Sequence, residues 1–113
     1  MKFNIEESDQ FLADVEEAAV WILLNNLEQS ETFAESKVDE FQADINALKV
    51  RLQSYPDSGE GDEVPGLRRF PIYNGRYSAK WIVNSIIKTV ILVALTDSKY
   101  PKSLREFSFD EDE

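Results

Sequence analysis

The residues best able to do chemistry lie in one hairpin-like stretch, residues 66–83. Two runs rich in β-branched and aromatic residues flank Asn74-Gly75, a pair typical of a two-residue hairpin turn. Because side chains alternate between the faces of a strand, this turn places basic, aromatic and hydroxyl side chains together on one face. They are Arg69, Tyr73, Arg76, Ser78 and Lys80. Such a face suits an anion, because guanidinium and ammonium groups donate charge-assisted hydrogen bonds.

Two of these cations, Arg69 and Lys80, are predicted to lie directly opposite each other. Like charges in that position cost up to about 1 kcal/mol relative to a neutral pair. One interpretation is that the pair presents its charge to an anion. The alternative is that both stems cover apolar surface while their charged ends stay in water. Pro71 has no N–H and is expected at a sheet edge or a bulge, and a bulge would move Arg69 relative to Lys80.

The other face of the hairpin is predicted to belong to the core. It carries Phe70, Ile72, Tyr77, Ala79 and Trp81. The same turn predicts that Tyr73 pairs with Arg76 and that Ile72 pairs with Tyr77.

The composition excludes several kinds of site. The 113 residues include no cysteine and no histidine. Disulfides, thiolate nucleophiles, zinc–thiolate sites and the usual general base are therefore excluded, and we expect no metal and no cofactor. No apolar run is long enough to cross a bilayer, and the first residues lack the apolar centre of a signal peptide. We expect a cytoplasmic protein without a membrane partner.

The charge is divided unevenly along the chain. The formal net charge is −10, which by itself speaks against nucleic acid as a partner. Residues 1–66 hold 4 basic and 16 acidic side chains, whereas residues 67–109 hold 8 basic and 2 acidic ones. An asymmetry of this size points to an ionic partner for the basic half.

The first half of the chain is predicted to form a strand and two helices. Residues 2–7 alternate as a strand with one buried face. Ser8 or Asp9 caps a helix that ends at about Leu27, and Ser30 caps a second helix over residues 31–54. The short connection predicts an antiparallel helical hairpin, with Trp21 in the core and with Tyr55 continuing the buried stripe of the second helix. Its acidic outer side is either a solvated surface or a docking surface for a basic partner.

The second half is predicted to form a sheet. Residues 56–66 are interpreted as a flexible linker, and residues 89–95 as a central strand covered on both sides. Phe107 and Phe109 are expected to pack back onto the domain. We therefore predict an α+β fold, in which an N-terminal strand and an antiparallel two-helix hairpin precede a three- to four-stranded antiparallel sheet. One domain covers residues 1–109, and residues 110–113 form an acidic, disordered tail.

This order of elements resembles the RelE/ParE superfamily of toxins from bacterial type II toxin–antitoxin modules, also called plasmid stabilisation proteins. In that family a helix ending in Tyr-Pro or Asn-Pro precedes a glycine-containing loop and a strand that begins Leu-Arg. Here these positions are Tyr55-Pro56, Gly59 and Leu67-Arg68. A basic hairpin with a Tyr-Arg or Arg-Tyr pair follows, here Arg76-Tyr77. The likeness covers roughly residues 2–100.

The RelE-like branch of this family implies a ribosome-dependent endoribonuclease that cuts mRNA. On that resemblance Arg76 stabilises the negative charge of the transition state. Lys99 or Tyr100 transfers the proton, which requires a lowered pKa. Nucleic acid would be bound by Arg68, Arg69, Tyr73 and Lys80.

Two other functions remain open at this point. The ParE-like branch resembles inhibitors of DNA gyrase that have no nuclease site, and a non-toxic interaction module could use the same fold. Either toxin implies a cognate antitoxin that folds on binding. The expected partners are therefore an antitoxin and either the ribosome with its mRNA or DNA gyrase, without a metal or a membrane.

Overall fold

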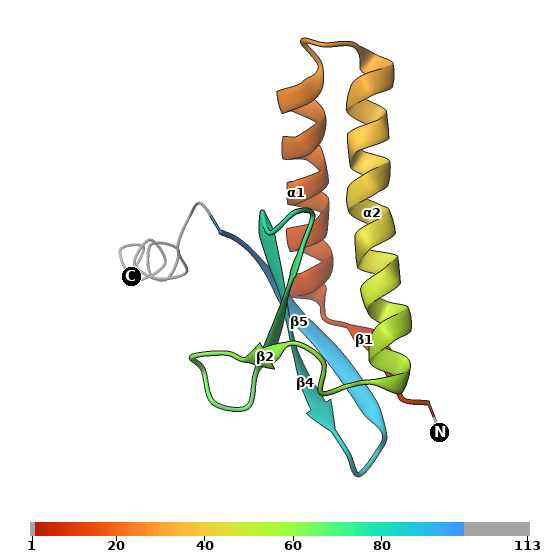
Figure 1. Ribbon diagram of the computed structural model, residues 1–113. Coiled ribbons are helices and arrows are strands. Elements are labelled where there is room, and N and C mark those ends of the chain that lie inside the picture. Colours follow the sequence, from red (N-terminus) through yellow and green to blue (C-terminus); the bar gives the residue numbers. More distant parts are fainter. Residues whose placement is uncertain (1, 99–113) are drawn as a thin grey trace.

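The computed structural model describes residues 2–98, which form one sheet and one helical hairpin (Figure 1). In chain order the elements are β1 (Asn4–Glu7), α1 (Asp9–Asn26), α2 (Glu31–Ser54), β2 (Glu60–Gly61), β3 (Arg68–Ile72), β4 (Tyr77–Asn84) and β5 (Thr89–Asp97). The sheet has the strand order β1-β5-β4-β3-β2. The helices lie against one face of the sheet, and the end of the hairpin where they connect projects beyond it (Figure 1). No helix in the described part of the chain is long and apolar enough to span a membrane.

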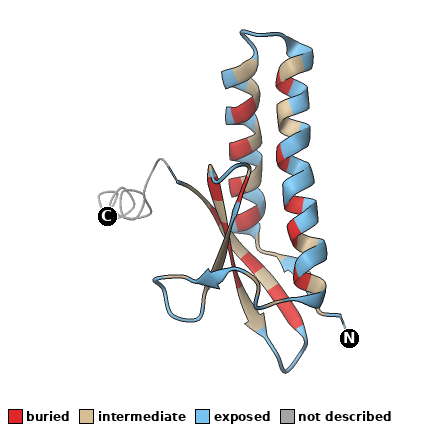
Figure 2. Ribbon diagram, in the orientation of Figure 1, coloured by how far each residue is buried: buried red, intermediate tan, exposed pale blue. Residues whose placement is uncertain are grey.

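Both helices begin at the predicted caps. The hydroxyl of Ser8 accepts the N–H of Phe11 at 3.0 Å, and that of Ser30 accepts the N–H of Phe33 at 3.0 Å. Each satisfies one of the N–H groups that a first helical turn leaves without an intrahelical partner. The core lies between helices and sheet (Figure 2), and its largest fully buried side chains are Trp81, Phe11, Phe41, Ile22, Leu52, Leu92 and Val90.

Two aromatic side chains that were predicted to be buried are exposed. Trp21 was predicted to be in the core but is 39% exposed, and Tyr55, predicted to continue the buried stripe of the second helix, is 68% exposed. Trp21 lies on the part of α1 near the projecting end of the hairpin, and Tyr55 is the residue that follows α2. Helical periodicity shows which side of a helix is apolar, but not where the neighbouring layer stops.

The sheet differs from the prediction in strand number and direction. The expected antiparallel sheet of three to four strands is a mixed sheet of five, because β1 pairs in parallel with β5 and β2 adds an outer strand. The predicted central position of residues 89–95 is confirmed, since β5 lies between β1 and β4, but the helices cover only one face of this strand and not both as predicted. A four-residue strand carries no sequence signal for a partner at the far end of the chain, so the parallel pair could not be predicted.

The β3–β4 hairpin has the predicted register but a larger turn. Ile72 pairs with Tyr77 and Arg69 with Lys80, as expected. Tyr73, Asn74 and Gly75 all have positive φ angles, of 52°, 56° and 80°. The N–H of Tyr73 donates to Asp44 of α2 at 2.8 Å instead of continuing the ladder. The connection is therefore a four-residue loop over residues 73–76. Its ends do not continue the strand pairing, but the predicted Tyr73–Arg76 pair keeps one backbone hydrogen bond, from the Arg76 N–H to the Tyr73 carbonyl at 3.1 Å.

Pro71 lies at an edge of the sheet, where a residue without an N–H is tolerated. The outer strand β2 pairs only with Arg68 and Arg69, so Pro71 is on an unpaired stretch of the β3 edge, as predicted. The irregularity in the sheet lies elsewhere, between Lys80 and Trp81 where β4 pairs with β5. The Arg69–Lys80 pair is therefore undisturbed.

The segment predicted as a flexible linker, residues 56–66, instead packs against the sheet, and we call it the strap. Its β2 strand pairs with β3, and the carbonyl of Pro56 accepts the indole N–H of the buried Trp81 at 2.9 Å. Gly59 has a φ of 76°, and a Cβ there would overlap the carbonyl oxygen of Arg69. Only glycine fits this close approach.

Candidate functional site

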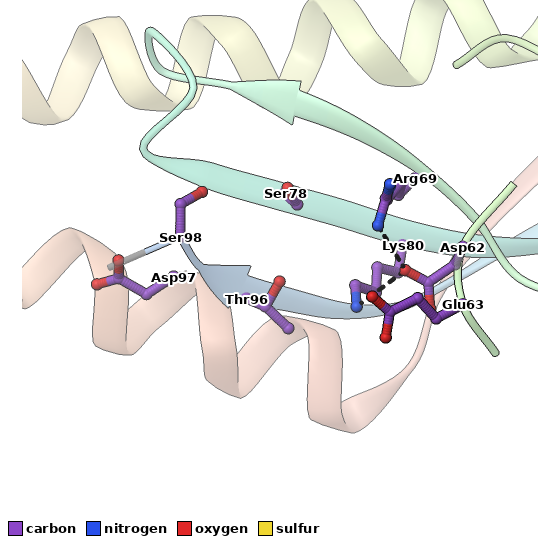
Figure 3. A pocket seen from close by; sticks show the side chains of 8 residues that line it. All are labelled: Asp62, Glu63, Arg69, Ser78, Lys80, Thr96, Asp97 and Ser98. Atoms are coloured by element: carbon purple, nitrogen blue, oxygen red, sulfur yellow. Dashed lines mark ion pairs between the residues drawn. The ribbon is translucent and has the colours of Figure 1, made fainter. Parts of the chain in front are cut away.

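The face of the sheet that points away from the helices carries an open pocket of about 160 Å³. Tyr77, Ala79 and Trp81 of β4 belong to the core, so alternation turns Ser78 and Lys80 to this open face. Three strands, the strap and Ser98 beyond β5 line the pocket. Figure 3 shows the side chains: Asp62, Glu63, Arg69, Ser78, Lys80, Thr96, Asp97 and Ser98.

The opposed cations of this face share one carboxylate. The Asp62 side chain approaches the ammonium of Lys80 at 3.2 Å and the guanidinium of Arg69 at 3.5 Å (Figure 3). Glu60 also contacts Arg69, at 3.2 Å. The side chains of Asp62 and Lys80 are only 2% and 8% exposed, so the charged end of Lys80 does not lie in water. The anion that faces these two cations here is part of the same chain.

The sequence reasoning did not identify Asp62, which fell within the predicted linker. The sequence nevertheless contained a signal for an acidic residue at this site. Two cations directly opposite each other need a nearby negative charge, and the segment before β3 supplies Glu60, Asp62 and Glu63. A strand of only two residues, however, is too short to be recognised from periodicity.

Arg76 lies apart from Arg69 and Lys80, which corrects the prediction of one shared face. Its Nε and a terminal nitrogen donate to the two carboxylate oxygens of Asp97 at 2.9 and 3.0 Å. Its guanidinium also stacks 4.1 Å from the ring centroid of Trp21 on α1. The four-residue loop causes this placement, because Arg76 precedes β4 and does not follow the alternation of the strand.

The remaining predicted residues are dispersed. The Tyr73 ring packs edge-on against Phe41 of α2, with 5.9 Å between centroids, and therefore contacts the helical layer. Arg68 donates to the strap carbonyls of Gly59, at 3.1 Å, and Ser58, at 3.3 Å. Lys99 and Tyr100 lie outside the described residues, as do Phe107, Phe109 and the acidic tail. No acidic cluster in residues 2–98 is arranged to hold a metal ion.

Burial raises the pKa of two tyrosines next to Arg76. For Tyr77, desolvation outweighs the opposing effect of the Arg76 charge, and for Tyr73 it outweighs the opposing effect of Lys37. Both phenols therefore stay protonated at neutral pH. Neither side chain is suited to removing a proton from a substrate in this environment.

We expect the free energy of unfolding to fall as the pH rises above the usual tyrosine pKa of 10.0. Above this value the unfolded chain loses the phenolic proton while folded Tyr77 retains it, so the folded state binds more protons and stability decreases with pH. Urea unfolding at about pH 9 and about pH 11 measures the decrease. Tyr77→Phe removes this phenol and leaves the other side chains unchanged, so the variant should show a smaller decrease. An equal decrease in both proteins would contradict the assignment.

The fold of this chain is similar to that of proteins of known structure. No protein-family model matches the sequence, and a comparison with curated protein sequences finds no match. Among solved structures, the chain is similar to a chain of the chromosomal ParDE toxin–antitoxin system from P. aeruginosa, with a TM-score of 0.60 and 20% identity over 85% of this chain and 96% of that one. It is also similar to a free-state mutant of the E. coli toxin RelE, with a TM-score of 0.56 and 9% identity over 98% of both chains. The isolated E. coli RelE toxin matches with a TM-score of 0.50 and 10% identity over 96% of this chain and 98% of that one. The predicted resemblance is thereby confirmed at the level of structure: the chain has a RelE/ParE-like toxin fold.

Proposed function

We propose that this chain is the toxin of a bacterial type II toxin–antitoxin module, and that it blocks translation by ribosome-dependent mRNA cleavage. The observation that carries the proposal is the convergence of Arg69 and Lys80 beside a pocket on the open face of a RelE/ParE-like fold. Two adjacent cations suit the phosphodiester backbone of RNA. The hydroxyls of Ser78 and Thr96, which line the same pocket, are further hydrogen-bonding groups for phosphate or ribose.

In this proposal Arg69 and Lys80 hold phosphates, and Arg76 stabilises the transition-state charge. Lys99 and Tyr100 complete the catalytic set, and Arg68 and Tyr73 contribute to RNA binding. Arg76 would have to exchange Asp97 for the substrate, because its bidentate contact with that carboxylate now occupies the guanidinium. The scissile phosphate would offer Arg76 the same bidentate geometry as the Asp97 carboxylate.

A second candidate is a ParE-like inhibitor of DNA gyrase that does not catalyse a reaction. Two observations favour it: the similarity to the ParDE structure and the exposed apolar side chains of α1. Val20 and Leu24 are 50% and 60% exposed, and both lie in the second half of α1, which leads into the connection between the helices. Apolar side chains gathered on such a surface are typical of protein–protein interfaces.

Either mode implies a cognate antitoxin and a cytoplasmic location, and both are part of the proposal. The acidic outer surface of the helical hairpin suits a basic antitoxin segment. Acidic and basic peptides, titrated against the purified protein, would test this choice. Preferential binding of the acidic peptide would exclude it.

Induced expression in a bacterium tests the proposed function. The wild type is compared with Arg69→Gln/Arg76→Gln/Lys80→Gln and with a control that removes three charges elsewhere, Lys2→Gln/Lys37→Gln/Lys88→Gln. We expect the wild type and the control to stop growth and protein synthesis, and the first triple variant to permit both. Arrest with DNA-damage signalling, relieved by Val20→Ser/Leu24→Ser instead, would favour the gyrase mode. Normal growth with folded wild-type protein would contradict both.

A further inference from the structure

We propose that the Asp62 carboxylate occupies an anion site formed by Lys80 and Arg69, and that the tip of the strap, residues 62–65, must leave before a phosphodiester can bind there. The inference deepens the proposed function and rests on it for the identity of the ligand. The strap is then an intramolecular competitor of RNA.

The first argument is the burial of the ion pair. An ammonium group removed from water is stable only next to a compensating negative charge. Lys80 is 8% exposed and Asp62 2% exposed, with 3.2 Å between Nζ and the carboxylate. Removing Asp62 from this position leaves an uncompensated cation, which an anion from solution would neutralise. The arrangement therefore has the properties of a site for one oxyanion.

The second argument is the charge of the closed face. Arg69 and Lys80 lie beside three carboxylates of the strap, those of Glu60, Asp62 and Glu63. With the strap in place the negative groups outnumber the positive ones, and a phosphodiester approaching the pocket is repelled. With the tip displaced, Asp62 and Glu63 leave while Glu60 stays in β2, so the two cations outnumber the one strap carboxylate that remains beside them. Displacement thus changes the sign of the charge at the pocket.

The third argument is that the tip is attached in a way that permits movement. The strap makes only two residue pairs with β3, at Glu60 and Gly61. Gly66, at the far end of the tip, has a φ of 89° with open space around it. Before the tip, the strap is held by the Pro56 carbonyl, which accepts the Trp81 indole N–H. The tip is closed by a backbone hydrogen bond from the Asp62 N–H to the Leu67 carbonyl at 2.9 Å, and its contact with the cations of the sheet is the Asp62 carboxylate. Glycines on either side of a short segment are suitable hinges.

RNA binding by the purified full-length protein tests the inference. Fluorescence anisotropy with a labelled single-stranded RNA of about 20 nucleotides reports the dissociation constant at low salt. The informative variant is Asp62→Asn, and the matched control is Asp57→Asn, which removes the same charge from an exposed position of the strap. We expect Asp62→Asn to bind at least about tenfold more tightly than wild type, with a steeper salt dependence, and Asp57→Asn to stay within about twofold.

A second comparison shows whether the gain comes from the proposed site. In Asp62→Asn/Lys80→Gln the gain should disappear, because the cation that Asp62 neutralises is gone. Equal binding by folded Asp62→Asn and Asp57→Asn would overturn the proposal. If Asp62→Asn fails to fold, Glu63→Gln takes its place, since Glu63 is an exposed residue of the tip and lines the pocket. It must then bind RNA more tightly than Asp57→Asn, and failure to do so also overturns the proposal.

The results also separate this inference from the proposed function. Tight RNA binding by Asp62→Asn together with harmless expression of the wild type would support the strap as a competitor and contradict the toxin. Arrest of translation by the wild type without any gain in Asp62→Asn would support the toxin and contradict the competitor.

Discussion

Replacing Trp81 by alanine should lower the free energy of unfolding by about 3–5 kcal/mol, the largest loss that we expect from a single change. The side chain is fully buried within the core cluster, and its indole N–H donates to the Pro56 carbonyl. The variant loses the transfer free energy of a large aromatic side chain, leaves a cavity, and frees the firm end of the strap. Domains of this size are stable by only about 5–15 kcal/mol, so the loss removes a large share of the total.

Urea unfolding followed by circular dichroism measures this loss, and two milder variants divide it into parts. Trp81→Phe keeps most of the buried ring but removes the donor to Pro56, so it should cost less and make residues 56–66 more sensitive to limited proteolysis. Trp21→Phe is the matched control, because Trp21 is the only other tryptophan and is 39% exposed. It should cost about 1 kcal/mol or less. A similar cost at both tryptophans would contradict the described core.

The second large effect is expected at Asp14, a buried carboxylate on α1. Its oxygens accept the N–H of Leu95 in β5 at 3.0 Å and the amide of Gln10 at 2.8 Å. Strand β1 ends at Glu7, after which the chain turns into α1, so this side of β5 has no strand partner at Leu95. Asp14 takes the place of that partner. Asp14→Ala should therefore cost about 2–3 kcal/mol, since a buried N–H loses its acceptor.

The conservative variant shows whether the hydrogen bond is the cause. Asp14→Asn retains a side-chain oxygen for the Leu95 N–H and should lose clearly less stability than Asp14→Ala. Hydrogen exchange at Leu95 provides a local readout, and it should accelerate in Asp14→Ala but not in Asp14→Asn. If Asp14→Ala unfolds at the wild-type urea concentration, the contact contributes nothing to stability.

Features governed by short-range rules were predictable from the sequence. Ser8 and Ser30 cap their helices because a hydroxyl at that position meets a first-turn N–H whatever the surrounding fold. The register of Arg69 against Lys80 followed from the position of Asn74-Gly75, and it is kept because the loop extends by one residue on each side of this pair.

Features that depend on distant segments were not predictable. The loop is wider because the N–H of Tyr73 is taken by Asp44 of α2, and the backbone carbonyl of Arg76 by Ser98 beyond β5. The same contacts move Arg76 away from Lys80 and onto Trp21. The candidate site was therefore predicted in its strand part, Arg69 and Lys80, and missed in its loop and strap parts.

The parallel pairing of β1 with β5 also determines when the sheet can be completed during synthesis of the chain. The hydroxyl of Ser8 donates to the carbonyl of Val93, 85 positions later in the chain. At synthesis rates of about 5–20 residues per second, several seconds separate the appearance of these two segments. During that interval the helical hairpin can form, because its contacts are local, but β1 has no partner because β5 has not yet been synthesised. The open face, and whatever it binds, therefore arises only after β5 (Thr89–Asp97) has been synthesised.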